Sequence, residues 1–207
     1  VGSEMCIRDS TYTWKPGVYG GRMPDAEPGN PYEDLWWKFV KGTDDATGRN
    51  TGTLTIGTDA AGGTNLTLTP DTAPWVDLIW RIFGDADAKA GLSHVTHFVA
   101  QAGKALTANL LLSADSLTGL FAANLGYTGL TRFTGTGFDV SNVTSLAHLF
   151  DGTSTLVQVL GIDGWKTGNV TDLSYMFAGN SKLTTITSLA PDGTKGTWDV
   201  HNAVSYT

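Results

Sequence analysis

Two segments in the second half of the chain are near copies of each other. Residues 138–150 read FDVSNVTSLAHLF, and residues 165–177, 27 positions later, read WKTGNVTDLSYMF. A third copy begins as WDVHN at residues 198–202, and a more divergent one is SLTGLF at residues 116–121. Self-similarity at a fixed period of this length is typical of solenoids, in which each unit stacks on the next. The repeat therefore predicts a stack of units in this half of the chain.

Apolar residues recur within each unit at the spacings of one short helix and one short strand. Val170, Leu173 and Met176 would share one face of a helix of about two turns. The expected strands carry matching apolar pairs in three units, namely Leu130 and Phe133, Val157 and Leu160, and Leu183 and Ile186. A single unit of this size buries too little apolar surface to fold alone. We therefore expect the strands to pair in a parallel sheet, with the short helices on the opposite side.

Asparagine and aromatic residues hold equivalent positions in successive units. The asparagines are Asn142, Asn169 and Asn202, and the aromatics are Phe138, Trp165 and Trp198, together with Phe121, Phe150 and Phe177. Turn asparagines bond neighbouring backbone readily, so we expect the three asparagines to form a ladder along the stack. We expect the aromatic residues to stack in the core.

The chain before the repeats has several local patterns. Pro- and Gly-rich turns surround a short helix expected at about Tyr32–Val40. Residues 51–56 and 64–69 alternate polar and apolar side chains on either side of a glycine-rich connection, which predicts an antiparallel hairpin. A short apolar helix is expected at 75–83 and a strand at 94–100.

These patterns predict an α/β fold in three parts. Residues 1–10 lack the apolar run of a secretory signal and resemble a translated adapter at the end of a metagenomic gene prediction, so we expect a non-native leader. Residues 11–72 would form a β-rich, aromatic N-terminal cap. Residues 73–207 would form a leucine-rich-repeat-like solenoid of short parallel strands and short helices. The chain ends inside a third copy, so we expect a fragment of a longer protein.

The motif W-x-x-x-N-V-T-x-L-x-x-M-F, followed by a leucine strand, resembles the repeats of the BspA-like leucine-rich repeat surface proteins of bacteria. The resemblance covers residues 130–206. It implies export, an extracellular or cell-surface location, and binding to proteins or glycans of host or neighbouring cells, without any catalytic residue. The chain departs from the pattern in its few repeats, the insert before Trp198, Ala203 in place of valine, and the lack of an anchor motif.

Composition excludes several classes of function. The net charge is −7 and the 13 Lys and Arg are scattered, which disfavours nucleic-acid binding. No run is long and apolar enough for a membrane span. His94 and His97 lie three apart on the predicted strand and would face opposite sides, so a shared metal is not expected. No cofactor motif and no recognisable catalytic constellation occurs, and we expect a protein that is not an enzyme.

The leading expectation for function is a surface module that binds other proteins, in the manner of an adhesin. Polar residues on the strand side, Gln158, Thr185 and Thr187, would face the partner. One alternative is a structural stalk that displays another domain. Another is a carbohydrate-binding module in which Trp36 and Trp37 form a platform for a sugar. The favoured role for these two residues and the aromatic residues around them is instead to cover the first edge of the solenoid.

Overall fold

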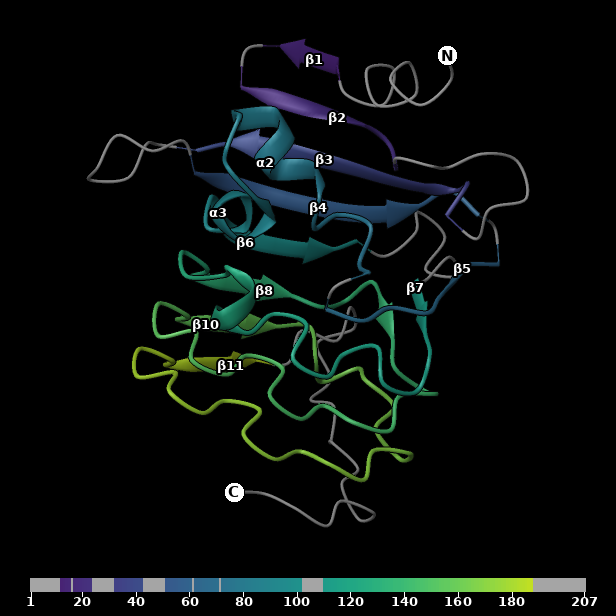
Figure 1. Ribbon diagram of the computed structural model, residues 1–207. Coiled ribbons are helices and arrows are strands. Elements are labelled where there is room, and N and C mark those ends of the chain that lie inside the picture. The colour runs from purple at the N-terminus through teal and green to yellow at the C-terminus, as the bar shows by residue number, and fades with distance from the viewer. Residues whose placement is uncertain are drawn as a thin grey trace.

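The computed structural model describes residues 12–15, 17–23, 32–42, 51–60, 62–70, 72–101 and 110–187. Its fold is mixed α/β, with two open sheets and a few short helices (Figure 1). The predictions for the leader 1–10 and for Trp198 and Asn202 fall outside the described residues.

The larger sheet has eight strands in the order β1-β2-β3-β4-β6-β8-β10-β11. They are β1 (Tyr12–Lys15), β2 (Val18–Arg22), β3 (Leu35–Lys41), β4 (Gly52–Thr58), β6 (Val95–Ala100), β8 (Arg132–Thr134), β10 (Gln158–Leu160) and β11 (Thr185–Thr187). The pairs from β1 to β4 are antiparallel, and every pair from β4 to β11 is parallel. The parallel strands predicted within residues 130–133, 157–160 and 183–186 are therefore confirmed as β8, β10 and β11, and the strand at 94–100 as β6.

A second, smaller sheet consists of three parallel strands in the order β5-β7-β9. They are β5 (Thr64–Leu66), β7 (Leu110–Leu112) and β9 (Phe138–Asp139). A 3-10 helix, η1 (Ala123–Leu125), follows the first of the repeat-like segments.

Two short helices, α2 (Leu78–Phe83) and α3 (Ala88–Leu92), cover one face of the larger sheet near its N-terminal strands (Figure 1). The Phe83 ring meets Tyr19 of β2 and Phe39 of β3 edge-on, at centroid distances of 6.1 and 5.4 Å. The carboxylate of Asp87 accepts a 2.8 Å bond from the Ala90 N–H and caps α3. The second part of the helix predicted at 75–83 is therefore present as α2.

Side-chain alternation along β3 separates two faces of the larger sheet. Leu35, Trp37 and Phe39 are fully buried and point toward the helices, whereas Trp36 and Lys38 point away and are partly exposed. The register carries this division to β4, because Trp37 pairs with Ile56 and Lys38 with Thr55. We call the side away from the helices the outer face.

Apolar side chains from both sheets and from the helices form one continuous core. The Phe121 and Phe150 rings lie 5.9 Å apart and nearly parallel, and Phe150 and Phe177 lie 5.7 Å apart with an angle of 10° between their planes. Phe133 joins these rings to Trp165 by an edge-on contact at 6.4 Å. The repeated aromatic residues thus lie one above another in successive units.

The helix predicted at Tyr32–Val40 is wrong, since most of this segment forms strand β3. Its residues alternate between the core and the outer face, and aromatic and β-branched side chains at a period of two favour a strand.

The antiparallel hairpin predicted from residues 51–56 and 64–69 is also wrong. Strand β4 lies between β3 and β6 in the larger sheet, whereas β5 pairs in parallel with β7 in the smaller one. The glycine-rich connection carries the chain from one sheet to the other, where Leu66 packs with Leu110 and Leu112 in the core.

Successive turns replace the helices that we expected in the repeats. Leu146, His148 and Phe150 donate their N–H groups to the carbonyls of residues 172, 174 and 176 in the next unit, at 2.9–3.0 Å. An α-helix would direct those N–H groups to its own carbonyls four residues earlier. Hydrogen bonding between units replaces hydrogen bonding within a helix here, because every second N–H reaches the next unit. The wall opposite the sheet is therefore a parallel ladder.

Candidate functional site

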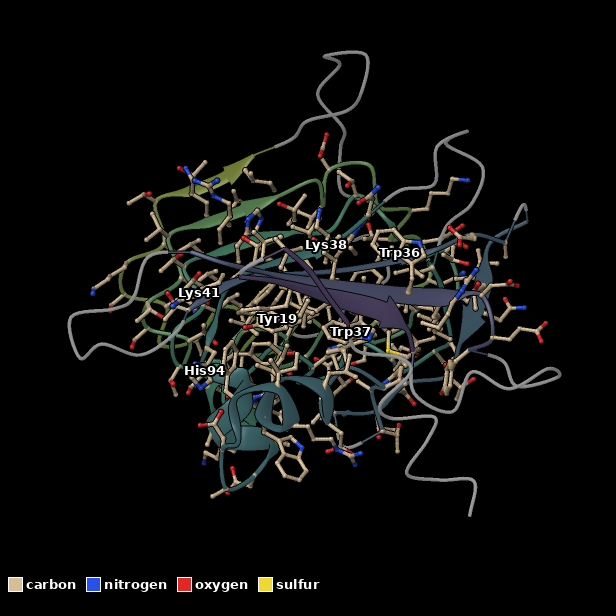
Figure 2. The ribbon with its side chains drawn as sticks, turned by 90° about the horizontal axis from the view of Figure 1, so that it is seen from above. Tyr19, Trp36, Trp37, Lys38, Lys41 and His94 are labelled. Carbon is tan, nitrogen blue, oxygen red and sulfur yellow. The ribbon has the colours of Figure 1, made fainter. Side chains whose placement is uncertain are left out.

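The outer face of the larger sheet is the candidate site. From β3 to β11, its outward positions align in register across six strands. They are Trp36, Lys38 and Val40 on β3, Thr53, Thr55 and Gly57 on β4, His97 and Val99 on β6, Arg132 and Thr134 on β8, Gln158 and Leu160 on β10, and Thr185 on β11. No helix of the described residues packs on this face (Figure 2).

The predicted partner-facing residues lie on this face where the structure describes them. Gln158 and Thr185 are paired in register and partly exposed, and both extend the row that holds Arg132 and His97. Thr187 pairs with Leu160 through the backbone, and its side chain lies outside the described part.

The charge of the outer face differs in sign from that of the chain. Lys38 and Arg132 are basic, and none of the outward positions on these six strands that the structure describes carries a carboxylate. The chain as a whole has 20 Asp and Glu against 13 Lys and Arg. The face therefore offers a positive surface within an acidic protein.

His97 occupies the centre of this face in its neutral form. Its Nε2 lies 2.9 Å from the Thr134 hydroxyl on the neighbouring strand. Burial, together with the Arg132 guanidinium beside it, lowers the pKa of His97 to about 4. At neutral pH the positive charge at this point of the sheet therefore belongs to Arg132.

Trp36 and Trp37 do not form a common platform, which corrects the glycan site predicted from the pair. Figure 2 shows Trp36 on the side of Lys38 and Trp37 on the side of Tyr19 and the helices. Consecutive residues of a strand point to opposite faces, and Trp37 is fully buried. The Trp36 indole lies across Gly57 of β4, where any side chain would overlap the ring.

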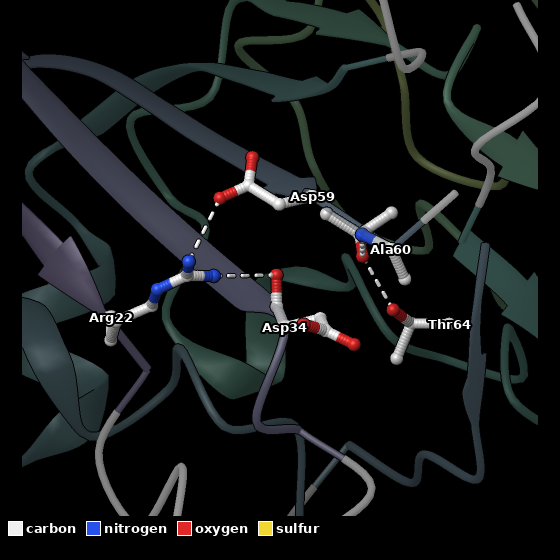
Figure 3. Close-up of polar contacts among 6 residues, drawn as sticks. Arg22, Asp34, Asp59, Ala60 and Thr64 are labelled. Carbon is white, nitrogen blue, oxygen red and sulfur yellow. Dashed lines mark hydrogen bonds and ion pairs between the residues drawn. The ribbon is translucent and has the colours of Figure 1, made fainter. Parts of the chain in front are cut away.

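A polar cluster fixes the edge of this face beside Trp36. Arg22 of β2 forms a 3.0 Å ion pair with Asp59 and donates a 3.1 Å bond to the carbonyl of Asp34 (Figure 3). The Thr58 hydroxyl accepts from the Ala60 N–H and bonds the Thr64 hydroxyl of β5, so it ties the two sheets together.

The predicted asparagine ladder is present at one of its three positions. The Asn169 side-chain amide donates a 2.6 Å bond to the Ser141 carbonyl of the preceding unit. Asn142 is exposed, and no bond of its side chain to a neighbouring unit is found among the described residues. Asn202 lies outside them.

Other polar side chains make the same kind of bond between units, and we did not predict these bonds from the sequence. Each donates to a backbone carbonyl of the preceding unit: Thr131, Thr144, Thr153, Thr155, Thr171, Thr184, Asn180 and the Trp165 indole. The frequency of threonine in this half of the chain was one available signal, and the repeated threonine of the N-V-T motif, Thr144 and Thr171, was another.

The two histidines considered as metal ligands lie apart, on opposite sides of the sheet. His94 is buried, with its Nε2 2.8 Å from the Asp85 carboxylate and its ring stacked on Phe83 at 4.6 Å. His97 faces outward. Within the described ranges, no three His, Cys, Asp or Glu residues are placed to hold one metal ion, and no helix is long and apolar enough to cross a bilayer.

Comparison with known proteins finds similarity in the repeat half of the chain. No match was found among curated proteins or among solved structures. Residues 117–206 match a family described as "Mycoplasma protein of unknown function, DUF285", which is consistent with a bacterial surface repeat protein.

Proposed function

We propose that this chain is the recognition part of a bacterial surface protein and that it binds a partner protein across the outer face of its larger sheet. The observation that carries the proposal is the concentration of basic and hydroxyl side chains, without a carboxylate, on the outward positions of six aligned strands. Complementary charge steers association and selects partners, so the expected partner presents an acidic surface.

The family match and the repeats support the wider setting of this proposal. The match to DUF285 over residues 117–206 and the motif of the BspA-like proteins favour a leucine-rich-repeat-like solenoid and a location outside the cell. The parallel pairing of β8, β10 and β11, one strand from each unit, agrees with such a stack.

A glycan partner is the second candidate, and one residue favours it. The Trp36 indole lies against Gly57 and remains partly exposed, as a ring that stacks on a sugar must be. It has no second ring beside it on this face, because Trp37 points into the core. A protein partner that contacts Lys38 and Arg132 therefore remains the leading proposal.

Immobilised chain tested against host matrix proteins, mucins and whole bacterial cells would test the proposal. We expect at least one protein ligand to bind and Arg132→Glu to weaken that binding about tenfold or more, because a reversed charge repels an acidic partner. Lys89→Glu is the matched control, since Lys89 is exposed on α3 at the helix side of the sheet.

Equal binding by the Arg132 and Lys89 variants would refute a role for the outer face. If the chain captures glycans and Trp36→Ala alone abolishes that binding, the partner is a carbohydrate and not a protein. The absence of any ligand across the whole panel would favour the structural stalk.

A further inference from the structure

The wall opposite the larger sheet carries a second surface of different chemistry. It consists of residues 114–123, 144–152 and 171–179, joined by backbone bonds from each unit to the next, and we call it the turn wall. Its charged groups are acidic: Asp115, Asp151 and Asp172 lie on it, and none of its residues is Lys or Arg. The two walls of the stack thus have opposite charge.

One position of the turn wall has a left-handed backbone in three successive units. Gly119 has φ +65°, and His148 and Tyr175 have φ +56° and +55°. The ladder shows that the three are equivalent, because Gly119 bonds residue 147 just as His148 bonds residue 174. This conformation suits glycine and strains a bulky side chain. The first unit has glycine at this position, as expected. The other two units nevertheless carry an aromatic ring here.

The two rings form an ordered and exposed stack. The His148 and Tyr175 centroids are 4.9 Å apart, and their planes differ by 12°. Tyr175 is 51% exposed and is one of two large hydrophobic residues of the described chain that reach solvent to this extent. Tyr175 is not among the residues that form the core or pack against it, so core packing does not explain why the strained position holds tyrosine.

Carboxylates surround this pair of rings. The Asp151 Oδ2 lies 2.8 Å from His148 Nδ1, and both side chains are well exposed. The Ser174 N–H donates a 2.8 Å bond to the Asp172 carboxylate. This bond, together with the nearby His148, keeps the pKa of Asp172 below its usual value. Asp172 is therefore charged at neutral pH. Aromatic faces and carboxylates are the two groups that attract a cationic side chain.

We propose that His148, Tyr175, Asp151 and Asp172 form a binding site for the arginine and lysine side chains of a partner protein. A guanidinium group stacks on the exposed tyrosine ring while its N–H groups reach the carboxylates. Arginine is common among the residues that dominate protein interfaces, where such pairs of ring and charge are frequent. This site is independent of the outer face, whose basic surface would repel the same partner.

The test uses the full chain and three peptides of equal length, in which Gly alternates with Arg, with Lys or with Glu. Tetramethylammonium serves as a small cationic probe. Binding is followed by calorimetry and by the NMR signals of His148 and Tyr175. We expect the Arg peptide to bind most tightly, the Lys peptide next, and the Glu peptide not at all. Tyr175→Gly should weaken Arg-peptide binding about tenfold, and its melting temperature should equal or exceed that of the parent chain because glycine relieves the positive φ.

Two further variants separate binding from folding. Asp151→Asn should weaken binding, whereas Asp139→Asn is the control, because Asp139 caps a local turn through the Ser141 N–H and lies off the turn wall. Tyr175→Asn tests the same position with another residue that tolerates a left-handed backbone. Arg132→Glu on the outer face should leave Arg-peptide binding intact.

Three results would overturn the proposal. Unchanged peptide binding in both Tyr175 variants would remove the ring from the site. A lower melting temperature in both would make the tyrosine a structural residue. Tight binding of tetramethylammonium without binding of the Arg peptide would assign the site to a small quaternary ammonium compound.

Discussion

Single hydroxyl groups and amides bond the units of this protein to one another, in addition to the packing of its apolar residues. The Thr153 hydroxyl is fully buried and donates a 3.0 Å bond to the Phe121 carbonyl of the preceding unit. The Asn180 amide divides its bonds between the carbonyls of Phe150 and Thr153. The Phe121 carbonyl accepts no backbone N–H among the described residues, and an unsatisfied buried carbonyl costs about 1–3 kcal/mol. The Phe150 and Thr153 carbonyls also accept the N–H groups of Thr153 and Leu156, so the Asn180 amide adds a second bond to each. The repeated polar residues are therefore part of the stacking interface.

His97 gives the clearest prediction at the scale of one residue. Its pKa of about 4 in the folded chain lies below the usual value of 6.5, so the unfolded chain binds a proton first as the pH falls. The contribution of His97 to stability is therefore complete above pH 6.5 and is lost as the pH falls from 6.5 toward 4. NMR titration of the imidazole should show this low pKa.

Arg132→Gln should raise the pKa of His97, because one cause of the low value is removed while burial remains. The groups around His97 are Thr53 on β4 and Arg132 and Thr134 on β8. A normal pKa of 6.5 for His97 in the parent chain would contradict the position assigned to its ring.

The helices and strands of the N-terminal half are packed through close backbone contacts. Gly91 of α3 lies against the backbone of Trp80 in α2, where a Cβ would overlap the Trp80 nitrogen. Phe83 of α2 packs on Tyr19 of β2, on Phe39 of β3 and on His94, which immediately precedes β6. A larger residue at Gly91 must therefore separate the helices from each other or from the sheet.

Gly91→Ala should lower the free energy of unfolding by about 1–3 kcal/mol, as overpacking does in a dense core. Gly62→Ala is the matched control, because a Cβ at Gly62 meets no atom within 4 Å. Urea denaturation of both variants measures the difference. Equal stability would show that α2 and α3 are not in close contact.

At the scale of the whole molecule, one core joins the N-terminal strands to the repeats. It runs without interruption from Met23, through Phe98 on β6, to Met176 in the last described unit. β4 pairs with β6 and β6 pairs with β8, so the sheet is also continuous across the boundary near residue 72 that we expected between cap and repeats. The two parts therefore share one apolar core and one sheet.

The chain should therefore unfold in a single transition. Tryptophan fluorescence, to which the buried Trp37 and Trp165 contribute from opposite parts of the core, and far-UV circular dichroism should give the same urea midpoint. Two separate midpoints would mean that the repeats and the N-terminal strands unfold independently.

The sequence by itself determined the features that depend on local repetition. The 27-residue period predicted parallel strands at equivalent positions, and the recurring phenylalanines predicted a column of rings, because each pattern repeats at a fixed spacing. The polar residues Gln158 and Thr185 could be assigned to the strand side for the same reason. These inferences needed no knowledge of which distant segments meet.

Only the tertiary structure decided the features that depend on pairing between distant segments. Trp36 and Trp37 are adjacent in sequence, yet the register of β3 between β2 and β4 sends one outward and the other into the core. Residues 64–66 pair with 110–112 and not with the preceding strand. The turns around His148 and Tyr175 bond each other across the two units and do not close into helices. In each case, hydrogen bonds and burial between residues dozens of positions apart decide which local conformation forms. A local sequence pattern does not contain those contacts and so cannot predict the outcome.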